Sequence, residues 1–187
     1  MPSEPRMEFA VSPASLADLE TPLVAIPVFA DDDRGAAFAA ADATTGGRLA
    51  RIADDESFEG KGGKSLLVHA QEGASAARIL LVGVGKRADF EPLVLRKVAA
   101  AAVRGANARK LAAAAVWIPA DLVDAASAVR FLVEGAGLGG YRYDDYKTHE
   151  HKPLTCERFV VGHADGAGQG DVMARAAATA RGVCLAR

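Results

Sequence analysis

The stretch Arg78-Ile79-Leu80-Leu81-Val82-Gly83-Val84-Gly85-Lys86 carries the clearest strand signal of this sequence. Within it, Arg78 to Val84 is predicted to form a buried strand. The continuous apolar stretch Leu23 to Phe29 is typical of a strand that is buried on both faces of a sheet. From Phe90 to Ala108 apolar residues recur at helical spacing, and Asp89 and Pro92 suit the start of that helix. A second apolar strand follows from Ala112 to Ile118. Strands that alternate with helices in this way predict a parallel sheet joined by helical crossovers.

The same alternation extends along the rest of the chain. The other expected strands are Met7 to Ser12, Leu23 to Phe29, Lys64 to Ala70 and Thr155 to Gly162; the other expected helices are Gly35 to Ala43, a short one through Ala53, one capped by Asp121 and one opened by Asp171. Pro27 predicts a bulge or strand end, because proline cannot donate to a ladder. The strands before and after Gln71 to Ala74 could pair as a hairpin or lie apart. Together the elements predict an α/β three-layer sandwich with a mixed, largely parallel sheet.

Composition narrows the class of protein. The 187 residues fit one domain, half of them are hydrophobic and a quarter are charged, and the formal net charge is −2. We expect a soluble protein, because no apolar run of about 18 residues could span a bilayer. The first residues lack a secretory signal, and Cys156 and Cys184 are too few for a disulfide framework, so both are interpreted as reduced, packing thiols in a cytoplasmic protein. The charge offers no global attraction to nucleic acid or to membranes.

Two glycine-rich stretches invite a phosphate-binding hypothesis. A Walker loop does not fit, because Leu80 and Arg87 stand where it needs a glycine and a Ser or Thr. Gly83-x-Gly85-x-x-Ala88 fits a permissive dinucleotide fingerprint, but no acidic residue follows at the usual distance, so we favour a tight strand-to-helix turn. The segment Glu59 to Lys64 could cradle an anion, but it precedes a strand and is interpreted as a hairpin turn.

Two clusters of polar residues allow further hypotheses. The stretch after Gly140 is rich in metal-ligand residue types, but no further ligands are predicted, and we favour a solvated polar loop; the residues are Asp144, Asp145, His149, Glu150 and His151. A basic cluster on and after one helix could meet phosphates, although a solvated helix face is the favoured interpretation; it consists of Arg96, Lys97, Arg104, Arg109 and Lys110. No Gly-x-Ser-x-Gly elbow or His-Glu-x-x-His helix is present. The sequence therefore assigns no catalytic, cofactor-binding or metal-binding residue.

Several stretches, taken together, resemble the N-terminal domain of the cytosol (leucyl) aminopeptidase family. They are Phe58-Glu59-Gly60-Lys61-Gly62-Gly63, the strand and glycine turn Arg78 to Lys86, the helix end and aromatic turn Glu134 to Thr148, and Gly182-Val183-Cys184-Leu185-Ala186-Arg187. The resemblance covers Leu19 to Arg187 and implies a macro-domain-like fold. It assigns 1–170 to the non-catalytic N-terminal domain and 171–187 to the start of a connector helix, with the catalytic domain absent.

The resemblance also implies what the parent enzyme does. In that family a separate C-terminal domain binds two divalent metals, which are zinc, manganese or magnesium, and activates water to remove N-terminal residues from peptides. The parent assembles as a hexamer. Lys61 is similar to a metal-site lysine of the family, but no Phe-Asp-x-Gly-Gly follows it, so no role is transferred. We expect this chain alone to be inactive and to serve assembly and active-site access; the alternatives are a macro-like module for ADP-ribose or another nucleotide, or a DNA-binding accessory domain.

Overall fold

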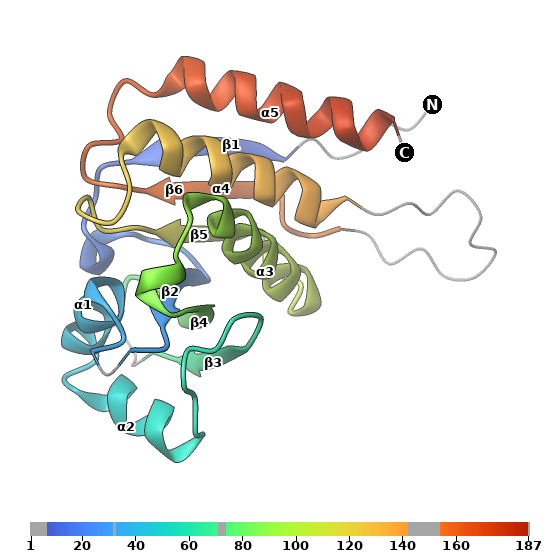
Figure 1. The fold of residues 1–187 in the computed structure, drawn as a ribbon. Helices are drawn as coiled ribbons and strands as arrows, with labels where there is room; N and C mark the ends of the chain where they lie inside the picture. The colour runs from blue at the N-terminus through green and yellow to red at the C-terminus, as the bar shows by residue number, and fades with distance from the viewer. Residues whose placement is uncertain (1–6, 32, 71–73, 142–153, 187) are drawn as a thin grey trace.

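The computed structural model describes residues 7–31, 33–70, 74–141 and 154–186. The strands described form one sheet in the order β1-β6-β5-β2-β4-β3, in which all neighbours are parallel except β3 and β4 (Figure 1). The strands are β1 (Glu8–Ser12), β2 (Val24–Phe29), β3 (Ser65–His69), β4 (Arg78–Gly85), β5 (Ala113–Trp117) and β6 (Arg158–Gly162); the α-helices are α1 (Ala36–Thr44), α2 (Arg48–Asp55), α3 (Leu95–Ala108), α4 (Ala125–Gly140) and α5 (Gly170–Leu185). This confirms the mixed, largely parallel sheet.

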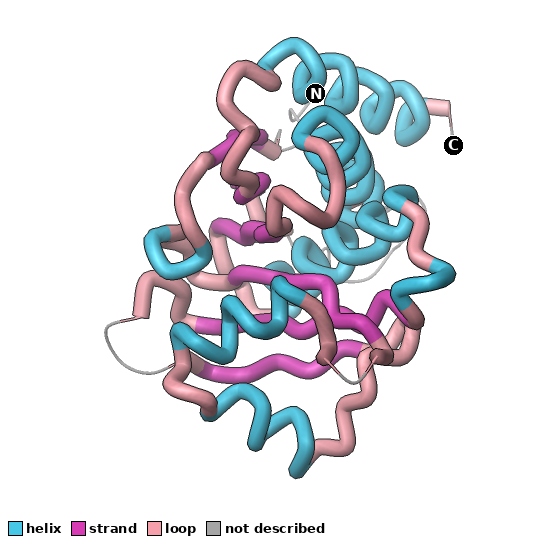
Figure 2. The backbone as a smooth tube through the Cα atoms, turned by 60° about the vertical axis from the view of Figure 1, so that its left-hand side comes forward, coloured by secondary structure: helices cyan, strands magenta, loops and turns pink. Residues whose placement is uncertain are grey.

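Helices cover both faces of the sheet, as the two views show (Figures 1 and 2). Residues of β4 alternate between two hydrophobic clusters, because successive side chains of a strand point to opposite faces. Leu80 and Val82 pack with α3 and α4, whereas Ile79 and Leu81 pack with α1 and α2. The unbroken apolar run of β4 is thus explained by burial on both sides, and the three-layer sandwich is confirmed. No helix within the described ranges is long and apolar enough to cross a bilayer.

Pro27 lies within β2 at a place where its missing N–H is not needed. The N–H of Ala115 donates to the carbonyl of Leu23 at 2.8 Å. In a parallel pair every second residue directs its backbone N–H and C=O to the same neighbour, so the backbone groups of Ala25 and Pro27 also face the β5 side. Pairing between β2 and β5 ends at Ala25, two residues before Pro27. The predicted irregularity is also present, because the register against β4 shifts between Val28 and Phe29.

The strands on either side of the 70–77 connection form an antiparallel hairpin. Ser65 of β3 lies opposite Val82 of β4, and His69 lies opposite Arg78. Of the two arrangements that the sequence allowed, the structure has the hairpin. It places β3 at the edge of the sheet next to β4.

The starts of two helices differ from the sequence prediction. Asp89 and Pro92 lie in 3-10 turns, and α3 begins only at Leu95. Helix α4 is capped by Asp124, whose carboxylate accepts from the N–H of Ser127 at 2.9 Å, and not by Asp121. Asp121 lies inside a turn that the N–H of Leu122 closes by donating to Pro119, so it stands too early to reach the helix.

Candidate functional site

The two glycine-rich stretches of the sequence pair with each other. The N–H of Gly83 donates to the carbonyl of Lys64 at 2.8 Å, and the N–H of Gly63 donates to the carbonyl of Gly83 at 3.3 Å. Two residues further along β4, the N–H of Gly85 donates to the carbonyl of Gly60 at 3.1 Å. The loop before β3 therefore lies directly against the end of β4.

Crowding at this contact leaves no room for a side chain at Gly83 or Gly60. A Cβ at Gly83 would stand 2.2 Å from the carbonyl oxygen of Lys61, and one at Gly60 would stand 2.3 Å from that of Phe29. Backbone of neighbouring segments thus accounts for the glycines at 60 and 83 without any ligand. The expected tight strand-to-helix turn was wrong, because the segment 86–94 and its 3-10 turns separate Gly85 from the start of α3.

The segment Glu59 to Lys64 joins α2 to β3, so it is not a hairpin turn as predicted. Lys61 forms an ion pair with Glu59 at the exposed tip of this segment. The hydrogen bond from Lys61, with its positive charge, lowers the pKa of the Glu59 carboxyl below its ordinary value. Lys61 is therefore partly neutralised by its neighbour.

A groove lies beside α3, bounded by the turn before β3 and by β4. Its volume is about 640 Å³, which falls within the roughly 300–1,000 Å³ of small-molecule sites. The floor is aliphatic and consists of Leu67, Leu80, Val82, Val94, Val98 and Ala101. Gly62, Gly63, Ser65 and Gly105 also line it. The groove is open to solvent because α3 packs over β4, β2 and β5. The part of the sheet face near β3 is therefore less covered by helices.

Among the residues that the structure describes, four cations and no carboxylate line this groove: Lys64, Lys97, Arg104 and Arg109. None of them forms an ion pair within the described part of the chain. Arg109 donates to the backbone carbonyl of Gly105 at 3.1 Å, which holds it at the end of α3. Three of the cations belong to the predicted basic cluster. Lys64 was considered only with the glycine loop, because its proximity to α3 depends on the β3–β4 hairpin.

The remaining members of the predicted basic cluster lie elsewhere. Arg96 forms an ion pair with Glu134 of α4, and Arg130 bonds the other oxygen of that carboxylate at 3.2 Å. The Glu134 side chain is only 4% exposed, whereas those of Arg96 and Arg130 are 36% and 60% exposed. Both guanidinium groups also contact the ring of Phe131. Arg96 therefore joins two helices, and only Lys110 remains a plain exposed residue after α3.

Histidines contribute no metal site in the described ranges, where no group of three or more His, Cys, Asp or Glu residues could hold an ion. His163 is fully buried and bonds backbone with both ring nitrogens: Nε2 lies 2.9 Å from the carbonyl of Val123, and Nδ1 lies 3.1 Å from the N–H of Asp165. Its role is to join two loops. The polar stretch with Asp144, Asp145, His149, Glu150 and His151 lies outside the described residues.

Comparison with known proteins decides the family. The profile described as "Cytosol aminopeptidase family, N-terminal domain" matches residues 25–150, which is more than half of the chain. The chain belongs to this family. The matched range contains both glycine-rich stretches, which the structure places against each other, and the groove beside them.

Relatives of this cytosol aminopeptidase domain are much longer. The cytosol aminopeptidase of Pseudomonas aeruginosa PAO1 is 31% identical over 187 residues, which make up 97% of this chain and 38% of that protein. Tomato leucine aminopeptidase (mutant K354E) has the same fold, with a TM-score of 0.78 at 20% identity over 99% of this chain and 37% of that one. The bottromycin maturation enzyme BotP in complex with Mn gives a TM-score of 0.62 at 25% identity, covering 89% of this chain and 31% of that one. The chain spans 38% of the relative from Pseudomonas aeruginosa and 29% of the probable cytosol aminopeptidase of Geobacter sp. (strain M21), to which it is 34% identical over 146 residues, or 77% of this chain.

Proposed function

We propose that the chain is the non-catalytic N-terminal domain of a cytoplasmic, metal-dependent leucyl aminopeptidase, where it supports assembly of a homo-oligomer and limits access to the active sites. The observation that carries the proposal is the family match combined with the share of the relatives that the chain spans. Within this proposal, metal chemistry belongs to the remainder of such an enzyme, which this chain does not span. The two catalytic cations would be zinc, manganese or magnesium.

Within this proposal, residues 1–170 form the domain and 171–187 begin the connection to the catalytic part. Helix α5 lies along α4, against which it buries Ala176, Ala177 and Ala180. Its last turn is different, because Val183 is 39% exposed and Leu185 is 88% exposed. Apolar side chains at the end of a helix are suited to contact with a following domain.

The test of inactivity uses leucine p-nitroanilide with Mn²⁺. We expect the purified chain to release no p-nitroaniline above the buffer rate, whereas the Pseudomonas aeruginosa relative under the same conditions serves as the positive control. The proposal would be overturned if peptidase activity followed the purified chain through two columns and was lost when a chelator was added. Such activity would require a complete metal centre in this chain.

The test of assembly and access uses a hybrid. The chain replaces the matching segment of the Pseudomonas aeruginosa enzyme, and the mass of the hybrid is measured by light scattering. We expect the hybrid to form the same oligomer as its parent and to keep the parent's ratio of activity on short and long peptides. A parent enzyme that lacks the segment altogether but keeps both its oligomeric mass and that ratio would contradict the proposed role.

A further inference from the structure

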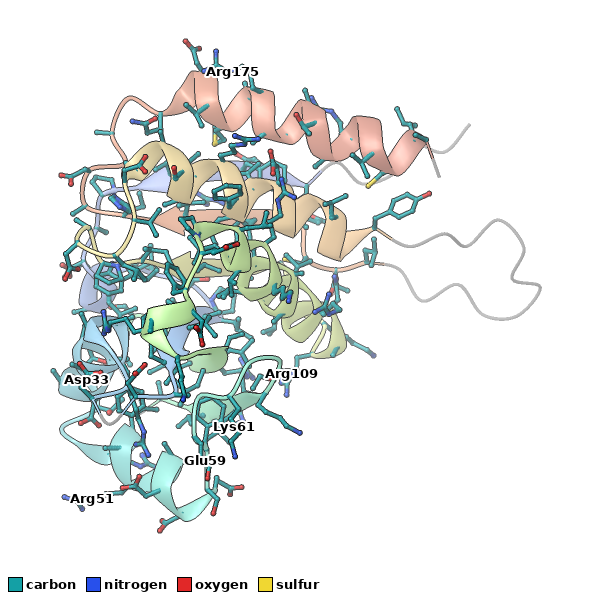
Figure 3. All side chains as sticks on the ribbon, in the orientation of Figure 1. Asp33, Arg51, Glu59, Lys61, Arg109 and Arg175 are labelled. Atoms are coloured by element: carbon teal, nitrogen blue, oxygen red, sulfur yellow. The ribbon has the colours of Figure 1, made fainter. Side chains whose placement is uncertain are left out.

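The groove beside α3 has features of a ligand site that the proposed function does not use. We propose that it binds an amphipathic anion, with an aliphatic body on its floor and a phosphate or carboxylate head held by the four cations. The juxtaposition that carries this is a set of unpaired basic side chains from two elements around one aliphatic hollow. Figure 3 shows that Arg109 lies in the same region of the molecule as Lys61 of the glycine loop, far from Arg175 on α5.

The positive charges of the lining side chains predict that the ligand is an anion. Lys97 and Arg104 are two turns apart on one face of α3, so they lie about 10 Å from each other along the helix. Lys64 comes from the opposite wall, at the start of β3. Like charges that face a shared hollow repel each other, and no carboxylate of the lining offsets them. An anion would relieve this repulsion and form charge-assisted hydrogen bonds.

The aliphatic side chains of the groove floor predict that the non-polar part of the ligand is an aliphatic chain. Leu67 of β3 and Ala101 of α3 are only half-buried, so a bound aliphatic group would remove further apolar surface from water. No aromatic side chain lines the groove, and stacking platforms are what nucleobases usually find in their sites. An aliphatic chain therefore fits this floor better than a base does. A DNA duplex is bound through its outer phosphates and would make no use of a concave apolar floor.

The binding test uses octyl phosphate below its micellar concentration, added to the isotope-labelled chain and followed by NMR. Octanol, which lacks the charge, and inorganic phosphate, which lacks the chain, are the controls. We expect saturable shifts at Leu67 and Ala101 with octyl phosphate and at least roughly tenfold weaker binding of either control, because two kinds of interaction are combined. Equal binding of inorganic phosphate, or no binding of octyl phosphate, overturns the proposal.

Variants locate the site. Lys97→Gln combined with Arg104→Gln should weaken octyl phosphate binding about tenfold, whereas Arg51→Gln combined with Arg175→Gln, exposed cations elsewhere, should leave it unchanged. Ala101→Leu fills the hollow with a good helix former and should abolish binding without unfolding the chain. Ala174→Leu on the exposed side of α5 is its matched control. Undiminished binding in both groove variants overturns the assignment.

Two further probes separate the sources of such an anion. Vesicles of phosphatidylcholine with phosphatidylglycerol present anionic phosphodiester head groups on a membrane, and a short DNA duplex presents phosphodiesters without an aliphatic body. We expect neither to displace octyl phosphate from the groove. If the chain binds either probe through Lys97 and Arg104 while free octyl phosphate does not bind, the ligand is not the one proposed here.

Discussion

Gly83 illustrates how a single residue joins two parts of this domain. A methyl group there would meet the carbonyl oxygen of Lys61 at 2.2 Å, and that neighbour is backbone, which cannot rotate away. We predict that Gly83→Ala lowers the free energy of unfolding by about 1–3 kcal/mol, as overpacking does elsewhere. Urea denaturation measures the effect.

Gly62 supplies the control for this prediction. It belongs to the same loop, but a Cβ added there would meet no atom within 4 Å. Gly62→Ala should therefore change the stability by no more than about 0.5 kcal/mol. Equal losses in both variants would show that the Gly83 contact is not what makes the glycine necessary.

Cys156 makes the stability of the domain depend on alkaline pH. Burial raises the pKa of its thiol from 9.0 to about 11, so the folded chain keeps the proton that the unfolded chain releases first. The stabilising contribution is fully present below pH 9 and is lost as the pH rises to 11, which amounts to about 1–3 kcal/mol.

The Cys156→Ala variant isolates this contribution from the other groups that titrate at high pH. We expect the variant to be less stable than the parent at pH 8, because it leaves a small cavity. Between pH 9 and 11 the difference should shrink, since only the parent loses the thiol contribution. Urea midpoints of both proteins at four pH values test this, and a constant difference would contradict it.

Among the helices, α4 depends on its cap. Asp124→Ala removes the acceptor for the N–H of Ser127 and should cost about 1 kcal/mol of stability. Asp121→Ala, the residue that the sequence favoured, should cost less than about 0.5 kcal/mol because it caps nothing. Thermal melts of the two variants distinguish the two positions. A larger loss at Asp121 would mean that the helix starts earlier in solution.

The same cap responds to acid. Hydrogen bonds from Ser127 lower the pKa of Asp124 below its ordinary 3.8. Because the pKa of Asp124 is lower in the folded chain than in the unfolded chain, its carboxylate stabilises the fold above pH 3.8. This stabilisation is lost as the pH falls through the pKa of the folded state. The gap between the parent and Asp124→Ala should therefore close in strong acid, which urea melts from pH 6 down to pH 2 would show.

Packing of α3 on α4 depends on an asymmetric set of charges. Glu134 is the buried member, so the loss of Arg96 leaves its carboxylate in the interior with one partner fewer. We predict that Arg96→Leu costs about 2–3 kcal/mol, whereas Arg130→Leu costs below about 1 kcal/mol because Arg130 is largely exposed. Chemical denaturation of both variants gives the comparison, and equal costs would contradict the asymmetry.

The elements that the sequence predicted best are those whose signal is local. The apolar run of β4 and the periodicity of α3 follow from burial alone, so both were recognisable. Helix starts were less predictable, because Asp121 and Asp124 are the same residue type and only the geometry of the preceding turn selects one. The groove was not predictable, since Lys64 and Arg104 meet only after the hairpin and the crossover have formed. The two glycine stretches gave no sign that they were each other's partners.

At the scale of the whole molecule, two clusters of buried side chains among the described residues form a core on each face of the sheet. Two buried polar side chains are paired in different ways: both ring nitrogens of His163 lie within hydrogen-bonding distance of backbone groups, and the Glu134 carboxylate bonds the side chains of Arg96 and Arg130. Packing on both faces of the sheet accounts for the stability of this described core.

A measurement on the intact chain follows from this arrangement. A metal that binds the folded state raises its stability, by about 4 kcal/mol when its concentration is a thousand times the dissociation constant. We therefore predict that neither EDTA nor 1 mM Mn²⁺ shifts the thermal midpoint by more than about 1 °C, because the described residues offer no ligand group. The control is the same scan on the bottromycin maturation enzyme BotP, for which a complex with Mn is known. A Zn²⁺ or Mn²⁺ shift in this chain that disappears in His149→Ala or His151→Ala would instead assign the ion to the polar stretch after Gly140 and would contradict the prediction.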